Sequence, residues 1–427
     1  MEAPLKQLFQ QEFSKMVAVI SRLFGLEHIE TAEDIVSETF LKAVETWGDQ
    51  GLPPNPTAWL YAVAKQKALY RFRRNSIYEK KVLPAIAREQ QDDAVSGFEF
   101  TPKNIRDSQL QMLFAVCTPA IAAEAQIGLA LRILCGFSIG EIAGAFLCRK
   151  DTINKRLFRA KEKLRTERVK MEMPPPAETA KRTESVLHII YLLFNEGYYS
   201  RTHPQNLRED LCFEALRLGV LLTGYEPTNL PETNALMALM CFHASRFGAR
   251  QSGAENLDGV GDQSAAAPQV LYEEQDEGLW DTTLINQGIQ FLKRSMQGDE
   301  ISTYHLEARI ASWHCVKEDS PGKWQSVLEL YDQLLLVNFS PSAALNRVFA
   351  FYKVNGPEAA LAEAEKLNMT DNHFYFVLLG EFYRSTDKER SIASFQRAYE
   401  LAGTPAEKEG IRRKLHALDK TGEPRVN

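Results

Sequence analysis

The sequence predicts an all-α protein. Apolar residues recur at intervals of three and four along nearly every segment, which is the period of a helix with one buried face, and the alternation typical of strands is scarce. Helix start signals accompany this pattern, such as Pro56 and Thr57 ahead of one apolar run and Ser138 ahead of another. At 427 residues the chain is long enough for two to three domains, each with its own core.

Breaks in the helical pattern divide the chain into six parts. Residues 76–107 lose the helical period and collect Gln, Asp, Gly and Pro, and a second break occurs at three consecutive prolines that end at Pro176. Residues 251–268 are rich in Gly, Ala, Ser and Asp, which predicts a mobile loop. The expected parts are two small helical domains at 1–75 and 108–170, linkers at 76–107 and 171–182, a helical extension at 183–320 and degenerate helical repeats at 321–427.

The last part has the pattern of degenerate tetratricopeptide-like helix pairs, with about one residue missing between the two helices. Its matching positions are Phe376, Leu379, Gly380, Tyr383, Phe395 and Ala398, and a weaker upstream copy includes Leu345, Asn346, Phe349 and Ala360. Two such units cannot form a long solenoid by themselves, so we expect them to pack on the helices that precede them.

Charge is unevenly distributed along the chain. Residues 1–170 contain 25 Lys and Arg against 20 Asp and Glu, a net charge of +5, whereas the remainder contains 25 against 36, a net charge of −11. A basic front half and an acidic back half predict a part that binds a polyanion and carries its own counter-charge. One hypothesis is that the acidic part docks on the basic part and sets when it is active.

Several other kinds of site are not expected. The six cysteines form no Cys-x-x-Cys pair, which predicts reduced buried thiols, and no stretch approaches the ~20 apolar residues of a membrane span. His243, His305 and His314 lack metal-ligand spacing, and neither a Gly-rich phosphate loop nor a nucleophile elbow occurs. We therefore expect a cytoplasmic protein with structural histidines, no metal, no cofactor and no enzymatic activity.

Residues 138–165 have the pattern of a DNA-binding helix-turn-helix. Ser138 and Glu141 predict a capping box at the start of the first helix. In the second helix Thr152, Lys155 and Arg159 point away from a predicted buried stripe, toward a major groove where Lys and Arg reach guanine edges or phosphates. This basic helix could instead be only a solvated face, and the turn has Leu147 where many such turns carry Gly. The predicted stripe comprises Ile153, Leu157, Ala160 and Leu164.

Two upstream segments are amphipathic in a distinctive way. The segment from Ala58 to Arg74 interleaves aromatic and basic residues, a composition that suits a surface following a phosphate backbone and stacking unpaired bases. The alternative is that these aromatics are core residues and the cations are merely solvated. The segment from Ala32 to Trp47 presents an acidic face with Asp34, Glu38 and Glu45.

The order of acidic helix, aromatic and basic helix, linker and helix-turn-helix resembles the extracytoplasmic-function group of sigma-70-type RNA polymerase sigma factors. Asp34 to Phe40 is similar to the segment of that group that binds core polymerase, and the helix from Ala58 to Arg74 is similar to its promoter-melting helix. Gln66 and Tyr70 stand where many members have Asn and Asp, so the minus-10 sequence preference does not carry over.

The resemblance covers about residues 5–168 and implies three sets of binding residues. Core RNA polymerase would be bound by Asp34, Glu38, Phe40 and Leu41. Minus-10 DNA and its melted strand would be bound by Trp59, Lys65, Gln66, Lys67, Tyr70, Arg71, Arg73 and Arg74. Minus-35 DNA would be bound by Arg149, Lys150, Thr152, Lys155, Arg156 and Arg159.

Three motifs of the second half are similar to a subgroup of these factors with a long C-terminal extension that ends in tetratricopeptide-like repeats. They are Tyr191–Tyr198, Glu273–Asp281 and Ala344–Arg347. In that subgroup the extension is thought to regulate activity in place of a separate anti-sigma factor. The resemblance thus implies a sigma factor with core RNA polymerase and promoter DNA as partners. Two alternatives stay open: a helical protein-binding scaffold with a DNA-binding front half, and a one-component transcription regulator that senses a ligand in its C-terminal half.

Overall fold

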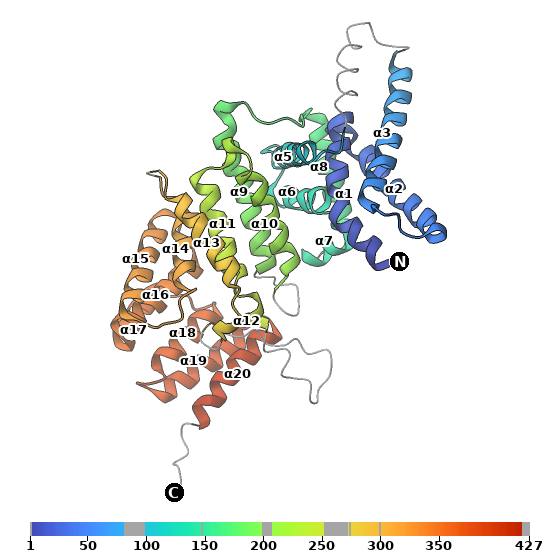
Figure 1. The fold of residues 1–427 in the computed structure, drawn as a ribbon. Helices are drawn as coiled ribbons and strands as arrows, with labels where there is room; N and C mark the ends of the chain where they lie inside the picture. The colour runs from blue at the N-terminus through green and yellow to red at the C-terminus, as the bar shows by residue number, and fades with distance from the viewer. Residues whose placement is uncertain are drawn as a thin grey trace. The chain divides into compact units, whose positions relative to one another are not determined.

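The computed structural model describes residues 2–80, 99–146, 148–198, 207–251, 272, 275–298 and 300–420. These ranges contain helices and connecting turns but no strand, which confirms the predicted all-α fold (Figure 1). The loop predicted at 251–268 lies outside the described residues except for Gln251. Leu147 of the predicted turn, and Glu273 and Glu274 of one motif, also lie outside them.

The chain divides into two compact units. Unit 1 comprises Met1–Glu196 and Phe213–Asn229, and unit 2 comprises Gly197–Cys212 and Leu230–Asn427. The six-part division stays a prediction, but helices extend into both of its linkers. Helix α3 runs on to Lys80, α5 begins at Pro102, and α9 begins at Pro176.

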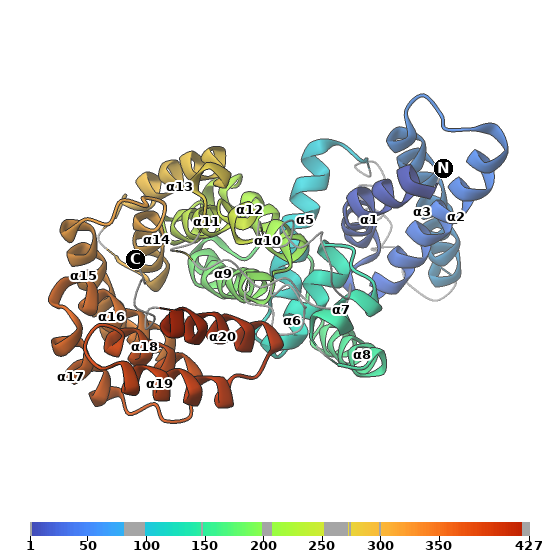
Figure 2. The same cartoon turned by 90° about the horizontal axis from the view of Figure 1, so that it is seen from below.

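Three long helices form the first group of unit 1: α1 (Glu2–Phe24), α2 (Ile29–Gln50) and α3 (Pro56–Lys80). They pack on one another and lie side by side in Figures 1 and 2. Gly25 and Gly51 follow α1 and α2 with φ of 87° and 77°, a conformation that glycine adopts at little cost. The buried faces of the three helices include Met16, Ile35 and Leu60.

A second group in unit 1 contains shorter helices. They are α5 (Pro102–Val116), α6 (Ala123–Leu129), the π-helical turn η2 (Ala130–Leu134), α7 (Ile139–Ala145) and α8 (Lys150–Thr166). Ser138 Oγ accepts a hydrogen bond from the Glu141 amide at 3.2 Å, and Glu141 Oε2 accepts one from the Ser138 amide at 2.7 Å. The predicted capping box is thereby confirmed. The predicted stripe of α8 is also buried throughout, at Ile153, Leu157, Ala160 and Leu164.

Two further helices, α9 (Pro176–Tyr198) and α10 (Glu209–Thr223), attach to this second group. Arg182 of α9 donates to the carbonyl oxygen of Phe114 in α5 at 2.8 Å. Arg217 of α10 donates to the carbonyl oxygen of Leu134 at the end of η2 at 2.5 Å. Each arginine thus satisfies a carbonyl near a helix end, where the helix itself supplies no partner.

Unit 2 begins with a group of helices around α11 (Pro231–Ala244), almost every residue of which is buried. Helices α13 (Thr282–Ser295) and α14 (Thr303–Trp313) both pack on α11. Gly288 of α13 allows a close approach, because a Cβ at this position would lie 2.7 Å from the Phe242 ring. The short helices α12 (Phe247–Gln251) and η6 (Glu277–Leu279) complete the group.

The rest of unit 2 is a succession of helix pairs in which each helix packs on the next (Figure 2). The helices are α15 (Pro321–Val337), α16 (Pro341–Asn355), α17 (Pro357–Leu367), α18 (His373–Tyr383), α19 (Lys388–Leu401) and α20 (Pro405–Lys420). A Cβ at Gly380 of α18 would lie 2.8 Å from the Phe395 ring of α19, so these helices approach as closely as glycine permits. Ser391 Oγ donates to the Gly380 carbonyl oxygen at 2.7 Å. Assignment of these pairs to tetratricopeptide-like repeats stays a prediction.

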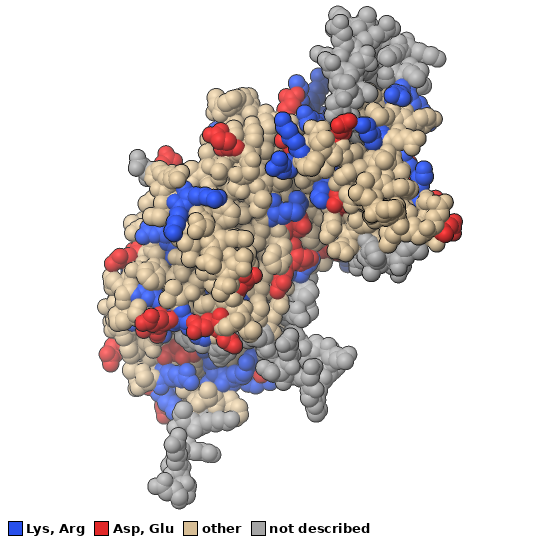
Figure 3. All heavy atoms as spheres, in the orientation of Figure 1, with Lys and Arg blue, Asp and Glu red and all other residues tan. Residues whose placement is uncertain are grey.

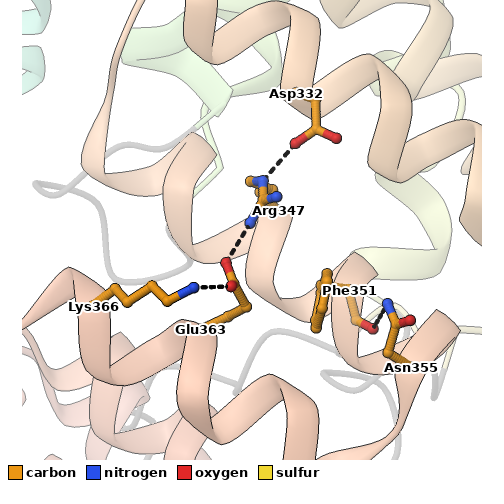
Figure 4. A network of polar contacts seen from close by, with 6 residues as sticks. All are labelled: Asp332, Arg347, Phe351, Asn355, Glu363 and Lys366. Carbon is orange, nitrogen blue, oxygen red and sulfur yellow. Dashed lines mark hydrogen bonds and ion pairs between the residues drawn. The ribbon is translucent and has the colours of Figure 1, made fainter.

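Arg347, the last residue of the third C-terminal motif, joins three of these helices (Figure 4). Its Nε lies 2.6 Å from Asp332 Oδ1 on α15, and its Nη1 lies 3.0 Å from Glu363 Oε2 on α17. Lys366 also pairs with Glu363, and Asn355 donates to the Phe351 carbonyl oxygen within α16 at 3.2 Å. The position of Arg347 indicates a structural role in fixing the order of α15, α16 and α17.

Candidate nucleic-acid interface

Helix α3 has one buried stripe and a basic outer surface. Leu60, Ala64 and Ala68 are spaced four residues apart and are fully buried, which fixes how α3 packs on α1 and α2. Gln66 and Tyr70 are exposed on other faces, and so are Arg73 and Arg74. Lys65, Lys67 and Arg71 are half-buried, and Lys and Arg side chains are visible along α3 in Figure 3.

Most aromatic residues of α3 pack against other rings. Trp59 meets Trp47 of α2 edge to face at a centroid distance of 5.2 Å, Tyr61 stacks on Phe100 at 4.8 Å, and Phe72 meets Phe24 of α1 at 5.7 Å. Tyr70 differs, because its side chain is 68% exposed. For stacking on unpaired bases, α3 therefore offers Tyr70, whereas Trp59 is held against α2.

The predicted polymerase-binding residues of α2 do not all lie on one face. Asp34 and Glu38 are exposed, and Leu41 is 59% exposed. Phe40 is only 5% exposed and packs against Phe9 of α1 at a ring distance of 5.0 Å. Phe40 therefore packs between α2 and α1 and is not part of the accessible surface of α2.

Val44 extends the outer face of α2 and was missed by motif matching. It is 51% exposed and lies three residues after Leu41, so both side chains stand on the same side of the helix. Leu41 and Val44 thus add an exposed apolar pair beside the carboxylates of Asp34 and Glu38. In the sequence, the three-residue spacing from Leu41 to Val44 could have indicated that both residues lie on one side of the helix.

Glu38 connects the acidic helix α2 with the basic helix α3. Its two carboxylate oxygens lie 3.0 Å from Lys67 Nζ and 2.9 Å from Arg71 Nη2. The hydrogen bond from Lys67, followed by the charges of Lys67 and Arg71, holds the pKa of Glu38 below its usual value despite partial burial. One residue predicted to bind polymerase and two predicted to bind DNA thus form a single charge cluster.

Helix α8 presents cations opposite its buried stripe. Arg149, Lys150, Thr152, Lys155 and Arg159 are exposed. Within the described part of the chain, no ion pair engages Lys155 or Arg159, so both charges are available to a partner. Phe158, which the sequence analysis did not single out, is 63% exposed among them.

Arg156 of α8 has a different environment from the other predicted minus-35 residues. Its Nη2 lies 3.1 Å from Glu124 Oε2 of α6, and its guanidinium lies 5.8 Å from the centre of the Phe146 ring. The side chain is half-buried. Arg156 therefore attaches α8 to the neighbouring α6 and the end of α7, and its charge is already partly compensated.

Comparison with known proteins identifies a family for the first three helices. Residues 8–77, which span α2 and most of α1 and α3, match Sigma-70 region 2. Residues 8–77 thus form a sigma-70 region 2. Members of this family act in transcription initiation and are not enzymes.

Two further matches are to proteins without an assigned role. Residues 182–296 match a family of unknown function. A protein of Rhizobium meliloti (strain 1021) described as uncharacterized is 32% identical over 397 residues, which cover 92% of this chain and 90% of that protein, so the two belong to one family. No solved structure matches the chain.

His305, His314 and Cys117 are held in buried or hydrogen-bonded surroundings. His305 Nδ1 lies 2.8 Å from Ser302 Oγ and its Nε2 lies 3.0 Å from the Ser295 carbonyl oxygen. Burial, with the charges of Arg246 and Lys323, lowers the pKa of His314 to about 3, and burial raises the pKa of the Cys117 thiol to about 12. The described ranges contain neither a cluster of side chains suited to a metal ion nor a helix able to span a membrane.

Proposed function

We propose that this chain is a sigma factor of the extracytoplasmic-function group that binds core RNA polymerase and directs it to promoters. The observation that carries this proposal is the match of residues 8–77 to Sigma-70 region 2, because it covers both the acidic face of α2 and the basic helix α3. Promoter binding and strand separation need charge and exposed aromatic surface rather than covalent chemistry.

Core polymerase binds the outer face of α2 in this proposal. Asp34, Glu38, Leu41 and Val44 form the accessible surface, and Phe40 supports it from below. Exposed apolar side chains bordered by carboxylates suit a partner surface that pairs an apolar patch with cations.

Helix α3 binds the minus-10 region and its opened strand. Lys65, Lys67, Arg71, Arg73 and Arg74 supply positive charge for phosphates, Gln66 and Tyr70 are exposed for contact with bases, and Trp59 holds α3 against α2. Because each phosphate contact releases bound counterions, promoter affinity should fall steeply with salt.

Helices α7 and α8 bind the minus-35 duplex as a helix-turn-helix. Arg149, Lys150, Thr152, Lys155 and Arg159 are exposed on the side opposite the buried stripe, which is the arrangement a recognition helix needs in a major groove. Arg156 acts as a positioning residue, since it is bound to Glu124.

The C-terminal extension regulates the sigma factor, and its last helices form tetratricopeptide-like repeats. The net charges of +5 for residues 1–170 and −11 for the rest favour attraction between the two halves. The helices from α15 to α20 follow one another as consecutive pairs, as expected of such repeats. Gly380 and Phe395 are in close contact between two of these helices.

In vitro transcription with purified core polymerase tests the proposal. Full-length protein should bind core polymerase and initiate from specific promoters selected from a fragmented genomic library. Variants in which Lys155 and Arg159 are replaced by alanine should retain core binding but lose promoter selectivity. Absence of both core binding and promoter-specific initiation would overturn the proposal, and duplex DNA binding that never requires polymerase would instead support a one-component regulator.

A further inference from the structure

Tyr272 is surrounded by four polar or aromatic side chains of unit 2. Lys323 Nζ lies 3.1 Å from Tyr272 Oη, and the guanidinium of Arg246 lies 5.6 Å from the centre of the Tyr272 ring. The His314 ring meets the Tyr272 ring edge to face at 5.2 Å, and the Trp280 ring stacks on it at 6.3 Å. These five residues are called the Tyr272 centre. Its other four members lie just after α11, η6 and α14 and at the start of α15, so the centre is formed where helices end or begin.

Two of the C-terminal sequence motifs meet at the Tyr272 centre. Trp280 lies in one of them, and Tyr198 is the last residue of another. Tyr198 Oη lies 3.4 Å from Arg246 Nη2, and the Tyr198 ring centre lies 4.0 Å from the guanidinium of Arg250. All of these residues fall within 182–296, the range that matches a family of unknown function. Residues far apart in that range thus converge on one buried and positively charged place.

The charge of Lys323 is buried without an ion pair in the described part of the chain. Lys323 is 2% exposed, and its ammonium donates to two uncharged groups, Tyr272 Oη and the carbonyl oxygen of Val316. The nearby carboxylate of Asp319 is bound by Lys353 at 3.1 Å instead. Burial lowers the pKa of Lys323, because an ammonium loses hydration when it leaves water. An anion placed beside Lys323 would offset that cost.

Trp280 and His314 supply further hydrogen-bonding groups. Trp280 Nε1 and His314 Nδ1 are buried and have no hydrogen-bond partner among the described residues. The Trp280 side chain belongs to a residue that is 6% exposed, and its indole N–H can only donate. Burial and the charges of Arg246 and Lys323 lower the pKa of His314 to about 3, so its imidazole is neutral and donates through one nitrogen. Buried donors normally have an acceptor.

We infer that the Tyr272 centre binds a small oxyanion, the phosphate or carboxylate group of a metabolite. The oxygens of such a group accept hydrogen bonds from the Lys323 ammonium, the Trp280 indole and the His314 imidazole. Arg246 adds positive charge, which favours an anion and disfavours a metal ion. A bound oxyanion would link the segment around Trp280 to α14 and α15. The inference goes beyond the proposed function and does not depend on it.

Tryptophan NMR on the full-length chain tests whether an oxyanion reaches Trp280. Labelling of the indole nitrogens gives signals for the five tryptophans, and Trp280→Phe identifies the signal of Trp280 while it keeps an aromatic ring. Inorganic phosphate and acetate are titrated separately, with sodium chloride at equal ionic strength as the control for screening. The Trp280 signal should move downfield, and the signal of Trp59 in unit 1 should stay in place. The probe that binds more tightly distinguishes a phosphate ligand from a carboxylate ligand.

Titration calorimetry with the tighter probe then measures the contribution of each donor. Lys323→Met removes the ammonium but keeps most of the aliphatic stem, and it should weaken binding about tenfold or more, since a hydrogen bond between charged groups is lost. Trp280→Phe should weaken binding about threefold or more through loss of one neutral donor. Lys388→Met is the matched control, because Lys388 is an exposed lysine of α19 in the same unit, and it should bind as the wild type does.

Circular dichroism identifies a variant that fails to fold, and the other variant then decides. The inference is wrong if neither probe moves the Trp280 signal, or if both folded variants bind as tightly as the wild type. It is also wrong if binding appears only after Glu273 and Glu274, which follow Tyr272 and lie outside the described residues, are replaced by Gln. The chain would then supply the anion itself. Failure of the holoenzyme to initiate transcription would overturn the proposed function but would leave these binding results unchanged.

Discussion

Glu38 is the residue at which the acidic surface of α2 and the basic surface of α3 meet. Lys67 and Arg71 hold its pKa below the usual value. A carboxyl group whose pKa is lower in the folded than in the unfolded state stabilises the fold above its unfolded pKa, and this contribution is lost as pH falls through the folded pKa. Because its side chain is 46% exposed, screening limits the contribution to at most about 1 kcal/mol.

Replacement of Glu38 by Gln should therefore lower the free energy of unfolding at neutral pH by about 0.3–1 kcal/mol. The difference from the wild type should vanish at an acidic pH low enough to protonate the carboxyl in both the folded and the unfolded state. Urea denaturation at the two pH values measures it. Glu45→Gln, on the same exposed side of α2, should show no such pH-dependent difference. An equal loss at both pH values for Glu38→Gln would contradict the ion-pair explanation.

Gly380 shows how a single missing side chain sets the distance between two helices. An added Cβ would lie 2.8 Å from the Phe395 ring, which is closer than real Cβ atoms approach. Gly380→Ala should lower the free energy of unfolding by about 1–3 kcal/mol through overpacking. Gly410→Ala on α20 is the matched control, because nothing lies within 4 Å of its added Cβ, and it should stabilise the protein by about 0.5–1 kcal/mol. Denaturation curves in which both variants behave alike would show that α18 and α19 are not this close.

At the scale of elements, the start of α7 depends on one reciprocal pair of hydrogen bonds. Ser138→Ala removes the side chain that accepts from the Glu141 amide, so it should cost about 1 kcal/mol of stability. Ser394→Ala is the comparison, because Ser394 donates to the Arg390 carbonyl oxygen in a solvent-exposed hydrogen bond within α19, and alanine suits a helix interior better. Thermal unfolding should therefore separate the two serine variants. A Ser138→Ala variant as stable as the wild type would show that the cap does not support α7.

Helix α8 has exposed cations that we propose bind DNA and a cation that attaches it to α6, and Arg159 and Arg156 should separate these two roles. Arg159→Ala should weaken promoter binding by the reconstituted holoenzyme and reduce the magnitude of the logarithmic salt slope by about 0.9, the value of one phosphate contact. Arg156→Ala should mainly lower thermal stability, because Arg156 pairs with Glu124. Fluorescence anisotropy over a salt series checks the first effect and calorimetry the second. Identical salt slopes for wild type and Arg159→Ala would exclude a phosphate contact at this position.

At the scale of the whole molecule, the boundary between the two units decides where the chain can be divided for a test of regulation. A break at the predicted linker 171–182 would remove α9 and α10, whose Arg182 and Arg217 bind carbonyls in the rest of unit 1. A chain that ends at Asn229 keeps all of unit 1.

We expect the chain truncated after Asn229 to bind promoter DNA, as holoenzyme, about fivefold or more tightly at low salt than the full-length protein does. The reason is that, in the proposed regulation, the acidic C-terminal part competes with DNA for the basic helices. Electrophoretic mobility shifts and in vitro transcription measure this effect, and circular dichroism verifies that the truncated chain is folded. Equal affinity and equal transcription for the two lengths would rule out regulation by the C-terminal extension.

Local features of the fold were predictable because their signals lie within one turn of helix. The capping box at Ser138 and the stripe beginning at Ile153 needed only residue type and spacing. Burial of Phe40 was also encoded, since Val36, Phe40, Ala43 and Trp47 recur at intervals of four, three and four. The match to a family motif instead placed Phe40 on the binding surface, although the period of these apolar residues predicts that Phe40 is buried.

The sequence by itself determined that the chain is helical, where the main charged helices lie and which sigma-70-type segments they resemble, because these properties depend on residues a few positions apart. Only the tertiary structure decided which charges are available and which are engaged. Glu33, Glu38 and Arg156 pair with residues on other helices, and Trp59 packs on Trp47. Such pairs join residues that are distant in the chain, and spacing along one helix contains no information about which other helix will lie against it.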